Sequence, residues 1–260
     1  MIEPLPERKL KMVIAYNGRN YHGWQRQAKG VVTVQYHVES ITGKVLRHPL
    51  HVMGASRTDA GVHAEGQVAT VVTTNLDIPP LGLRRAINAR LPEDIEIRSI
   101  KEVPMWFHPT LSADAKTYQY RICTMPTRPV HLVGQVWKHD RPLDLDRIHA
   151  ASRLLLGRND YASFTTAKDL RASTVRTLFR CDIVETEIGL DVVVDGDGFL
   201  YNMVRNIVGT LAEIGRGRWE PEKIRELLAN PVKCSFGRTA PPDGLTLMCL
   251  HYPPEAEKLD

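Results

Sequence analysis

The feature that most restricts the fold of this chain is the order in which its hydrophobic patterns change. Segments with a two-residue period, typical of half-buried strands, alternate with segments whose apolar residues recur every three to four positions, as in amphipathic helices. In the first part of the chain, strands are expected at residues 11–16, 68–73 and 95–97, and helices at 34–45 and 83–91.

The same kind of order returns from about His108 onward. In this part, strands are expected at residues 118–122, 174–185, 190–194 and 245–249. Helices are expected at 145–155 and 200–214, with a short one near Pro221. Thr33 and Asp144 stand where N-caps are needed. The pattern predicts an α+β fold in which two strand–helix–strand (ferredoxin-like) halves form a mixed, mainly antiparallel sheet, with helices on one face and a cleft between the halves.

We therefore expect an N-terminal α+β half over residues 1–107, a C-terminal α+β half over 108–252 and a disordered acidic tail over 253–260. The 260 residues are 43% hydrophobic and 25% charged, with a mean hydropathy of −0.25. This composition excludes a disordered, collagen-like or coiled-coil protein, and no apolar run approaches the roughly 18 residues of a membrane span. The first residues contain no apolar signal-peptide core, so a cytoplasmic protein is expected.

The positive charge is concentrated in the first half. The chain holds 34 Lys and Arg against 30 Asp and Glu, and residues 1–107 account for 14 and 10 of these, which leaves 20 of each in the rest. A modest basic excess permits a polyanionic partner without requiring one. The four cysteines match no metal-ligand spacing, and no metal site is predicted.

Residues 54–68 combine three glycines with Arg57, Asp59, His63 and Glu65 between an expected helix and an expected strand. A carboxylate on such a loop can act as a nucleophile or a base. The alternative is a Gly-rich turn in which Arg57 pairs on the surface with Asp59 or Glu65. His63 is interpreted as a hydrogen-bonding partner within the loop, with RNA contact as a second role.

A second candidate loop carries both aromatic and basic residues. Tyr21, Trp24, Arg26 and Gln27 follow the first expected strand, and this combination suits RNA binding. The alternative is that Trp24 anchors the loop to the core.

Five motifs in order resemble the tRNA pseudouridine synthase A family and extend over about residues 11–251. They are YNGRNYHGWQRQ (16–27), SRTDAGVHA (56–64), NARLPEDI (88–95), FLYNMVRNIVG (199–209) and APPDGLTL (240–247). The resemblance implies isomerisation of uridine to pseudouridine at nucleotides 38, 39 and 40 of the tRNA anticodon stem-loop, by a homodimer that uses no cofactor.

The resemblance also implies roles for individual residues. Asp59 matches the catalytic aspartate, Arg57 the arginine that assists base extrusion, Tyr118 the active-site tyrosine, and Arg205 the arginine that pairs with the aspartate. The chain departs from the family pattern in supporting positions, namely Asn17, Ser56, Lys116 and Pro109-Thr110. These departures bear on the substrate range rather than on the reaction.

The chemistry gives independent reasons for these residue types. A stacked uridine must be flipped out before its glycosidic bond can be broken, and a cation such as Arg57 can fill the vacated space. Tyr118 can stack on the base and Leu245 can form a wall of the pocket, although both would also suit the core. Burial would raise the pKa of Asp59, and the Arg205 guanidinium would counter that rise.

For Arg205 the alternative is a solvated helix arginine, since Arg205 lies off the apolar stripe with Asn202 and Asn206, on a flank that could line a cleft. For the whole chain the alternatives are a non-catalytic tRNA-binding or chaperone protein and a metal-dependent hydrolase. The sequence leaves open whether Asp59 attacks the sugar carbon or removes a neighbouring proton.

Overall fold

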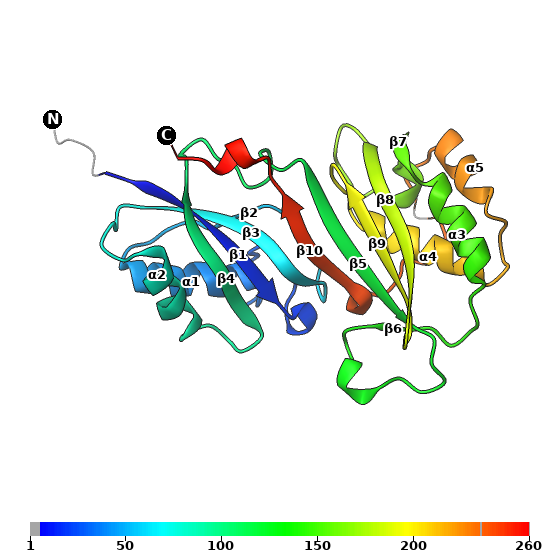
Figure 1. Ribbon diagram of the computed structural model, residues 1–260, viewed down its shortest axis with the longest axis horizontal. Helices are drawn as coiled ribbons and strands as arrows, with labels where there is room; N and C mark the ends of the chain where they lie inside the picture. Colours follow the sequence, from blue (N-terminus) through cyan, green and yellow to red (C-terminus); the bar gives the residue numbers. More distant parts are fainter. Residues whose placement is uncertain (1–5, 235, 260) are drawn as a thin grey trace. The chain divides into compact units, whose positions relative to one another are not determined.

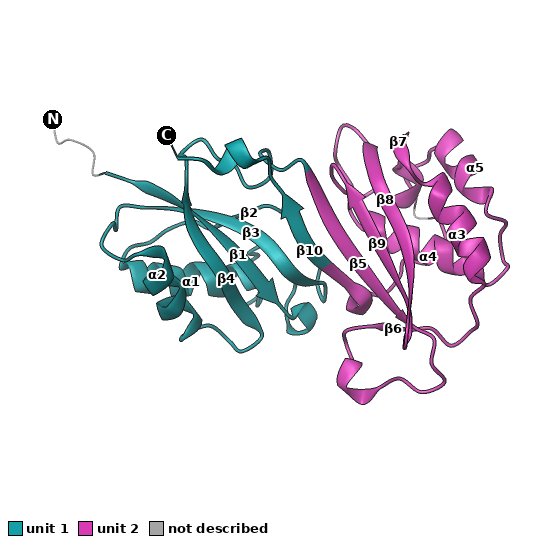
Figure 2. Ribbon diagram, in the orientation of Figure 1, with its two compact units in different colours: residues 1–114, 247–260 teal, residues 115–246 magenta. Residues whose placement is uncertain are grey.

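A computed structural model describes residues 6–234 and 236–259 (Figure 1). The chain divides into two compact units (Figure 2): the first runs to residue 114 and takes up the chain again from 247, and the second spans 115–246. The division differs from the expected contiguous halves, because the last strand returns to the first unit. A strand that pairs across a sheet can come from any distance along the chain, so hydrophobic periodicity alone does not assign it.

The first unit is built on a sheet with strand order β4-β1-β3-β10. Both β3 and β4 run antiparallel to β1, and the short β2 pairs with β3. Helices α1 and α2 lie on one face of this sheet (Figure 1). The elements are β1 (Arg8–Tyr16), η1 (Gly18–Asn20), α1 (Val34–Leu46), β2 (Met53–Gly54), β3 (His63–Thr73), α2 (Pro80–Asn88), β4 (Ile95–Val103), β10 (Leu245–His251) and η5 (Pro254–Glu257).

The second unit repeats the architecture with strand order β5-β9-β8-β7. Neighbouring strands in this order run antiparallel to each other. The short β6, which lies outside this order, runs parallel to β5. The elements are β5 (Ala115–Cys123), η2 (Val130–Leu132), β6 (Trp137–Lys138), α3 (Leu145–Leu154), β7 (Gly157–Asp160), η3 (Ala162–Phe164), β8 (Val175–Thr186), β9 (Gly189–Gly196), α4 (Met203–Gly215), α5 (Lys223–Ala229) and η4 (Pro242–Gly244). The α+β fold with a mixed, mainly antiparallel sheet is thereby confirmed.

Both N-caps expected from the sequence are present. The Thr33 hydroxyl accepts a hydrogen bond from the Tyr36 amide at 3.4 Å, and the Asp144 carboxylate accepts one from Arg147 at 3.1 Å. Each satisfies one of the amides that a helix leaves unpaired in its first turn. Within the described residues, no helix is both long and apolar enough to cross a membrane.

The predicted disorder of the C-terminal tail is wrong for residues 254–257, which form η5. Ala256 is buried against Phe107 and Val103, and Tyr252 packs on the same cluster. The Glu257 carboxylate accepts hydrogen bonds from the ammonium groups of Lys11 and Lys101. The acidic composition of the tail indicated solvation, but these two lysines of the sheet supply partners that lie far away in the sequence.

Candidate active site

Asp59 lies at the first corner of a tight turn between β2 and β3. The Val62 amide donates to the Asp59 carbonyl at 3.1 Å, and Gly61 has φ = +81°, which matches the third position of a type II turn. Only glycine adopts that conformation without strain. The Asp59 side chain is half-buried. We call residues 55–62 the Asp59 loop.

The segment after β1 is packed closely against the Asp59 loop. A Cβ atom on Gly23 would lie 2.6 Å from the Thr58 carbonyl oxygen, and one on Gly18 would lie 1.9 Å from the Val62 carbonyl oxygen. The Trp24 amide donates to the Thr58 carbonyl at 3.1 Å. Glycines at these two positions are therefore required for backbone-to-backbone contact, and they fix the loop from one side.

A buried polar network fixes the other side of the loop. Gln67, on β3, is fully buried; its Oε1 accepts from the Ser56 amide at 3.1 Å, and its Nε2 donates to the Ser56 carbonyl at 2.7 Å. The hydroxyls of Tyr16 and Thr58 are hydrogen-bonded at 2.7 Å. Because buried polar groups that are fully paired hold one conformation, this network gives the turn around Asp59 a defined position.

The other polar residues of this region separate into two roles. His63 is buried, and its Nδ1 accepts a hydrogen bond from the Gly18 amide at 3.1 Å, so this partner lies in η1 rather than within the loop. Arg57 is exposed. The expected alternative pairing of Arg57 with Glu65 is wrong, because the Glu65 carboxylate pairs with Arg98 on β4.

The aromatic residues of the second candidate loop serve the core. Trp24 is 1% exposed, stacks on Tyr16 with ring centroids 6.0 Å apart, and lies where a side chain on Gly54 would be. Tyr21 is also buried, and its hydroxyl donates to the Asp94 carboxylate. In this conformation neither ring is available for stacking on RNA, and the anchoring role for Trp24 is the one its burial supports.

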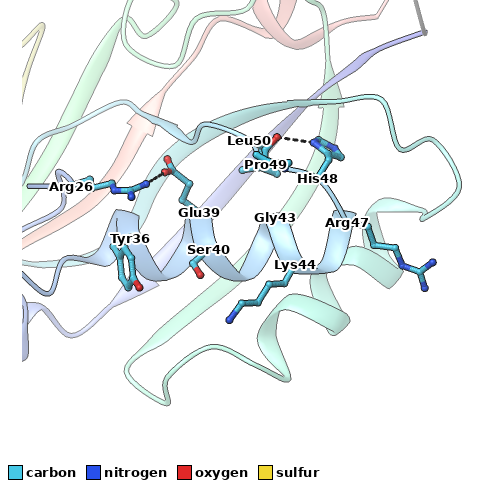
Figure 3. Close-up of a pocket in the computed structure, with 10 residues that line it drawn as sticks. All are labelled: Arg26, Tyr36, Glu39, Ser40, Gly43, Lys44, Arg47, His48, Pro49 and Leu50. Carbon is cyan, nitrogen blue, oxygen red and sulfur yellow. Dashed lines mark hydrogen bonds and ion pairs between the residues drawn. The ribbon is translucent and has the colours of Figure 1, made fainter. Parts of the chain in front are cut away.

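The two polar members of that loop, Arg26 and Gln27, are exposed. The Gln27 amide donates to the His22 carbonyl at 2.8 Å. Arg26 pairs with Glu39 at 2.5 Å and lies over the Tyr36 ring at 5.7 Å, at one end of a pocket of about 550 Å³ along α1 (Figure 3). The pocket also includes the cationic side chains of Lys44 and Arg47.

Tyr118 occupies the middle of β5 in the second unit, opposite Val194 on β9. Its ring is largely buried and meets Phe199 edge-to-face, with centroids 5.1 Å apart. Tyr120 is fully buried, and its hydroxyl donates to the Pro241 carbonyl at 2.7 Å. Leu245 is 6% exposed at the start of β10.

Arg205 lies in the first turn of α4 and is fixed to a neighbouring segment. Its Nε donates to the Ala240 carbonyl at 2.8 Å, and its own carbonyl accepts from the Ala240 amide at 3.1 Å. The Nη1 atom donates to the Asn202 side chain at 2.9 Å. Arg205 is thus a positioned guanidinium rather than a solvated one. Asn206 differs from the expectation of a cleft-lining flank, because it is fully buried and donates to the Phe164 carbonyl.

Each unit brings part of the predicted set together. Arg57 and Asp59 lie on the Asp59 loop of the first unit, and His63 directly follows it at the start of β3. Tyr118, Arg205 and Leu245 belong to the second unit, since β10 enters the first unit only from residue 247. Gln67 and Phe199 were not among the predicted site residues. Phe199 begins a quoted motif, but no spacing rule links it to Tyr118, which is distant in sequence. Among the described residues, no group of three or more His, Cys, Asp or Glu is arranged to hold a metal ion.

Comparisons with known proteins agree on one family. A family model described as tRNA pseudouridine synthase matches residues 12–110 and 151–253. Among curated relatives, the tRNA pseudouridine synthase A of Methylacidiphilum infernorum is 36% identical over 95% of this chain and 96% of its own length. That of Syntrophotalea carbinolica is 41% identical over 95% and 97%, and that of Clostridium acetobutylicum is 38% identical over 94% and 100%.

The matches cover both units and every motif that carried the resemblance. The expected reaction class, isomerisation of uridine in tRNA, is confirmed at the level of the family. With a matching family model over most of its length and full-length relatives above 30% identity, the chain belongs to the tRNA pseudouridine synthase family.

Proposed function

We propose that this isomerase converts uridine to pseudouridine at nucleotides 38, 39 and 40 of the tRNA anticodon stem-loop, with Asp59 as its catalytic carboxylate. The observation that carries the proposal is the rigid presentation of Asp59. Its turn is closed by a hydrogen bond to Val62, packed against Gly23, and held from β3 by Gln67. A reacting group held in one position saves the entropy that a mobile side chain would lose in the transition state.

The reaction conserves every atom of the nucleotide. The bond between the ribose carbon C1′ and uracil N1 breaks, the base turns, and a bond forms between C1′ and uracil C5, which loses its proton while N1 gains one. Asp59 acts on the ribose of the flipped nucleotide, either as a nucleophile at C1′ or as a base toward a neighbouring proton. Both routes require the ionised carboxylate, and both require that water be kept away from the reactive sugar.

The remaining residues follow from the resemblance and from their surroundings. Arg57, which is exposed two residues before Asp59, takes the space of the flipped base and contacts phosphate. Tyr118, whose ring is braced by Phe199, stacks on the uracil, and Leu245 forms an apolar wall. Arg205, fixed through Ala240, is the proposed cationic partner that keeps Asp59 ionised.

The decisive variant is Asp59→Asn, which keeps the shape of the side chain and removes its charge. We expect no detectable pseudouridine by chemical labelling of unmodified tRNA transcripts, while tRNA binding stays within about threefold of wild type, since catalysis rather than binding is removed. Glu65→Gln is the matched control, because Glu65 follows the same loop but pairs with Arg98. Conversion of uridine by Asp59→Asn would disprove the assignment.

Four further parts of the proposal have their own measurements. Mapping the modified positions in the transcripts tests the anticodon stem-loop; modification confined to another arm contradicts it. Sedimentation of the purified protein tests the proposed homodimer, and a single monomeric species at micromolar concentration contradicts it. Full activity in chelator without added nucleotide or metal is expected of a cofactor-free enzyme. A cytoplasmic location is proposed because the substrate is tRNA, and cell fractionation tests it.

A further inference from the structure

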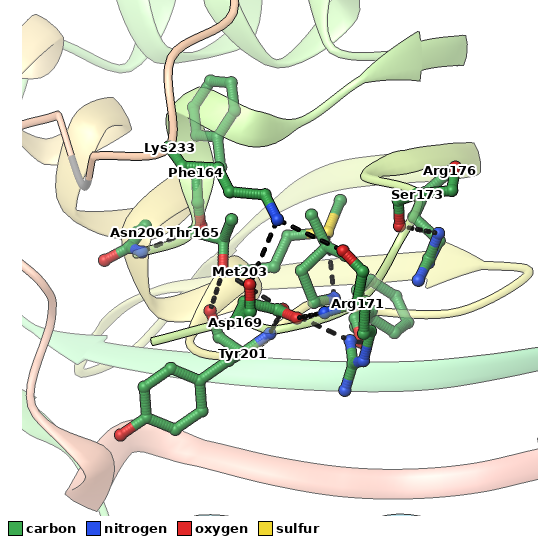
Figure 4. Close-up of polar contacts among 12 residues, drawn as sticks. Phe164, Thr165, Asp169, Arg171, Ser173, Arg176, Tyr201, Met203, Asn206 and Lys233 are labelled. Carbon is green, nitrogen blue, oxygen red and sulfur yellow. Dashed lines mark hydrogen bonds and ion pairs between the residues drawn. The ribbon is translucent and has the colours of Figure 1, made fainter. Parts of the chain in front are cut away.

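Cationic side chains gather along a loop of the second unit that carries one buried carboxylate (Figure 4). The side chain of Asp169 is 2% exposed, and it accepts hydrogen bonds from the backbone amides of Tyr201 at 2.8 Å and Arg171 at 3.1 Å. Burial alone would raise the pKa of Asp169, but these hydrogen bonds outweigh it, so the pKa lies below its usual value. Asp169 is therefore an ionised anchor for the loop that carries Arg171.

Three cations meet around this loop, and each is held through part of its donor set. Arg171 contacts the Phe199 carbonyl at 2.6 Å and the Asp169 carboxylate at 3.6 Å, both through Nη1. Arg176 donates from Nη1 to the carbonyls of Ser173 and Val175. The Lys233 ammonium donates to the carbonyls of Asp169 and Arg171 at 3.1 and 3.2 Å. We call Arg171, Arg176 and Lys233 the basic cluster.

The contacts orient the cluster without using all of its donors. A guanidinium has five N–H groups and an ammonium has three. The Arg171 side chain is 48% exposed, and Lys233 is exposed as well. Donors therefore remain for a ligand on groups whose positions are already fixed, which is the condition under which binding loses little side-chain entropy.

The cations of this region lie close enough to lower one another's pKa. Burial and the nearby Arg171 lower the pKa of Lys116 to about 8, and the same two causes lower the pKa of Arg176. The carboxylates that act on Arg176 are Asp197 and Asp169. These cations repel one another, and an anion bound among them would relieve part of that repulsion.

The position of the cluster indicates which anion it takes. Arg171 binds the carbonyl of Phe199, and the Phe199 ring contacts Tyr118, the proposed stacking partner of the target uracil. Tyr201, whose amide binds Asp169, is 40% exposed beside the same loop. Planar guanidinium groups suit the phosphodiester backbone of single-stranded or loop RNA, and the loop that carries Arg171 also binds the backbone of the exposed Tyr201.

We propose that the basic cluster binds a phosphate group of the tRNA adjacent to the flipped uridine. The inference rests on the proposed function only in assuming that Tyr118 receives the target base. It goes beyond the reaction by assigning substrate-backbone recognition to the loop of residues 165–173 together with Arg176 and Lys233. The competing interpretation is that the three cations serve only to hold this loop in place.

The first test is Arg171→Gln, which can keep a donor for the Phe199 carbonyl while it removes the charge. We expect the KM for tRNA to rise about five- to tenfold with kcat within twofold of wild type, and the slope of log Kd against log salt to fall by about one. Arg153→Gln, at an exposed position of α3, is the matched control for charge and should leave both values unchanged. Thermal unfolding of each variant shows whether the loop is intact.

The second test removes the charge from the RNA instead. Anticodon stem-loop RNAs with one uncharged methylphosphonate linkage, moved in turn through the positions flanking the target uridine, are bound by wild type and by Arg171→Gln. At one flanking position, the uncharged linkage should weaken binding by wild type about as much as Arg171→Gln weakens binding of the normal RNA. The same linkage should not weaken binding by Arg171→Gln any further, because the two changes remove the same contact.

The outcomes separate this inference from the proposed function. An unchanged KM and salt slope for Arg171→Gln, or additive losses at every flanking linkage, overturns the phosphate site even if Asp59→Asn is inactive. A loss of kcat with a lowered melting temperature and normal salt slope also overturns it, in favour of the purely structural role. If Asp59→Asn remained active, the catalytic assignment would fail while the linkage-specific result could still stand.

Discussion

Gln67→Leu tests whether the Asp59 loop is held by its buried polar network. Leucine has a similar volume to glutamine, so the substitution opens little empty space and removes mainly hydrogen bonds. Gln67 is fully buried and contacts both the amide and the carbonyl of Ser56 at 3.1 and 2.7 Å. Each of these buried groups that loses its Gln67 partner costs about 1–3 kcal/mol, so the loop should lose about 2–6 kcal/mol of local stability.

The assay has to report on the loop itself, because a chain of two compact units need not unfold in a single step. Hydrogen exchange of the amides in residues 55–62 measures local opening directly. A loss of 2 kcal/mol, the lower end of the range, corresponds to about 30-fold faster exchange. We also expect kcat to fall with little change in the KM for tRNA, since Asp59 is then held less firmly.

The matched control is Gln135→Leu in the second unit. Gln135 is half-buried and donates one long hydrogen bond, 3.4 Å, to the carbonyl of His131. Its replacement should change exchange in the Asp59 loop by less than about twofold, as is usual for surface substitutions. A folded Gln67→Leu protein whose loop amides exchange within threefold of wild type would refute the argument that Gln67 fixes the loop.

Two further predictions concern backbone approach and the C-terminal tail. Gly23→Ala should destabilise the first unit by more than Gly30→Ala, because both glycines have positive φ (+90° and +95°) but only Gly23 faces a carbonyl oxygen at 2.6 Å; equal losses in urea titrations contradict the steric argument. Glu257→Gln should cost about 3 kcal/mol at pH 7, because it leaves the buried Lys11 without its carboxylate. Burial would raise the pKa of Glu257, but hydrogen bonds from lysines lower it below 4.5, so its stabilising effect is complete above pH 4.5 and disappears as pH falls through the lower folded-state value. The difference in urea midpoint between the variant and wild type should therefore shrink as the pH is lowered below 4.5, whereas the exposed Glu255→Gln should match wild type at every pH.

Local chemistry explains the parts of the structure that the sequence predicted well. Thr33 and Asp144 cap helices because a short polar side chain needs only the amide three residues ahead. The α4 stripe through Met203, Ile207 and Leu211 is buried, as its helical spacing indicates. The turn at Asp59 also follows from nearby residues, since Gly61 supplies the left-handed conformation.

Residues whose partners lie far along the chain could not be assigned in this way. Trp24 suits an RNA-binding surface by composition, but its burial depends on packing against Tyr16 and Gly54. Asn206 has a polar side chain on a helix, and its burial is favourable because the Phe164 carbonyl and the Thr239 hydroxyl, both distant in sequence, pair with it. In the same way, the acidic tail is ordered because two lysines of the first sheet meet Glu257.

The sequence by itself determined the α+β class, the order of the elements and the family, because these depend on short-range periodicity and on contiguous motifs. The tertiary structure alone decided which polar residues are buried, that most of the last strand belongs to the first unit, and that Arg171, Arg176 and Lys233 gather along the loop that carries Asp169. The physical reason is that burial of a polar group is favourable only where a partner is present. Most of these partners come from distant segments that only folding brings together.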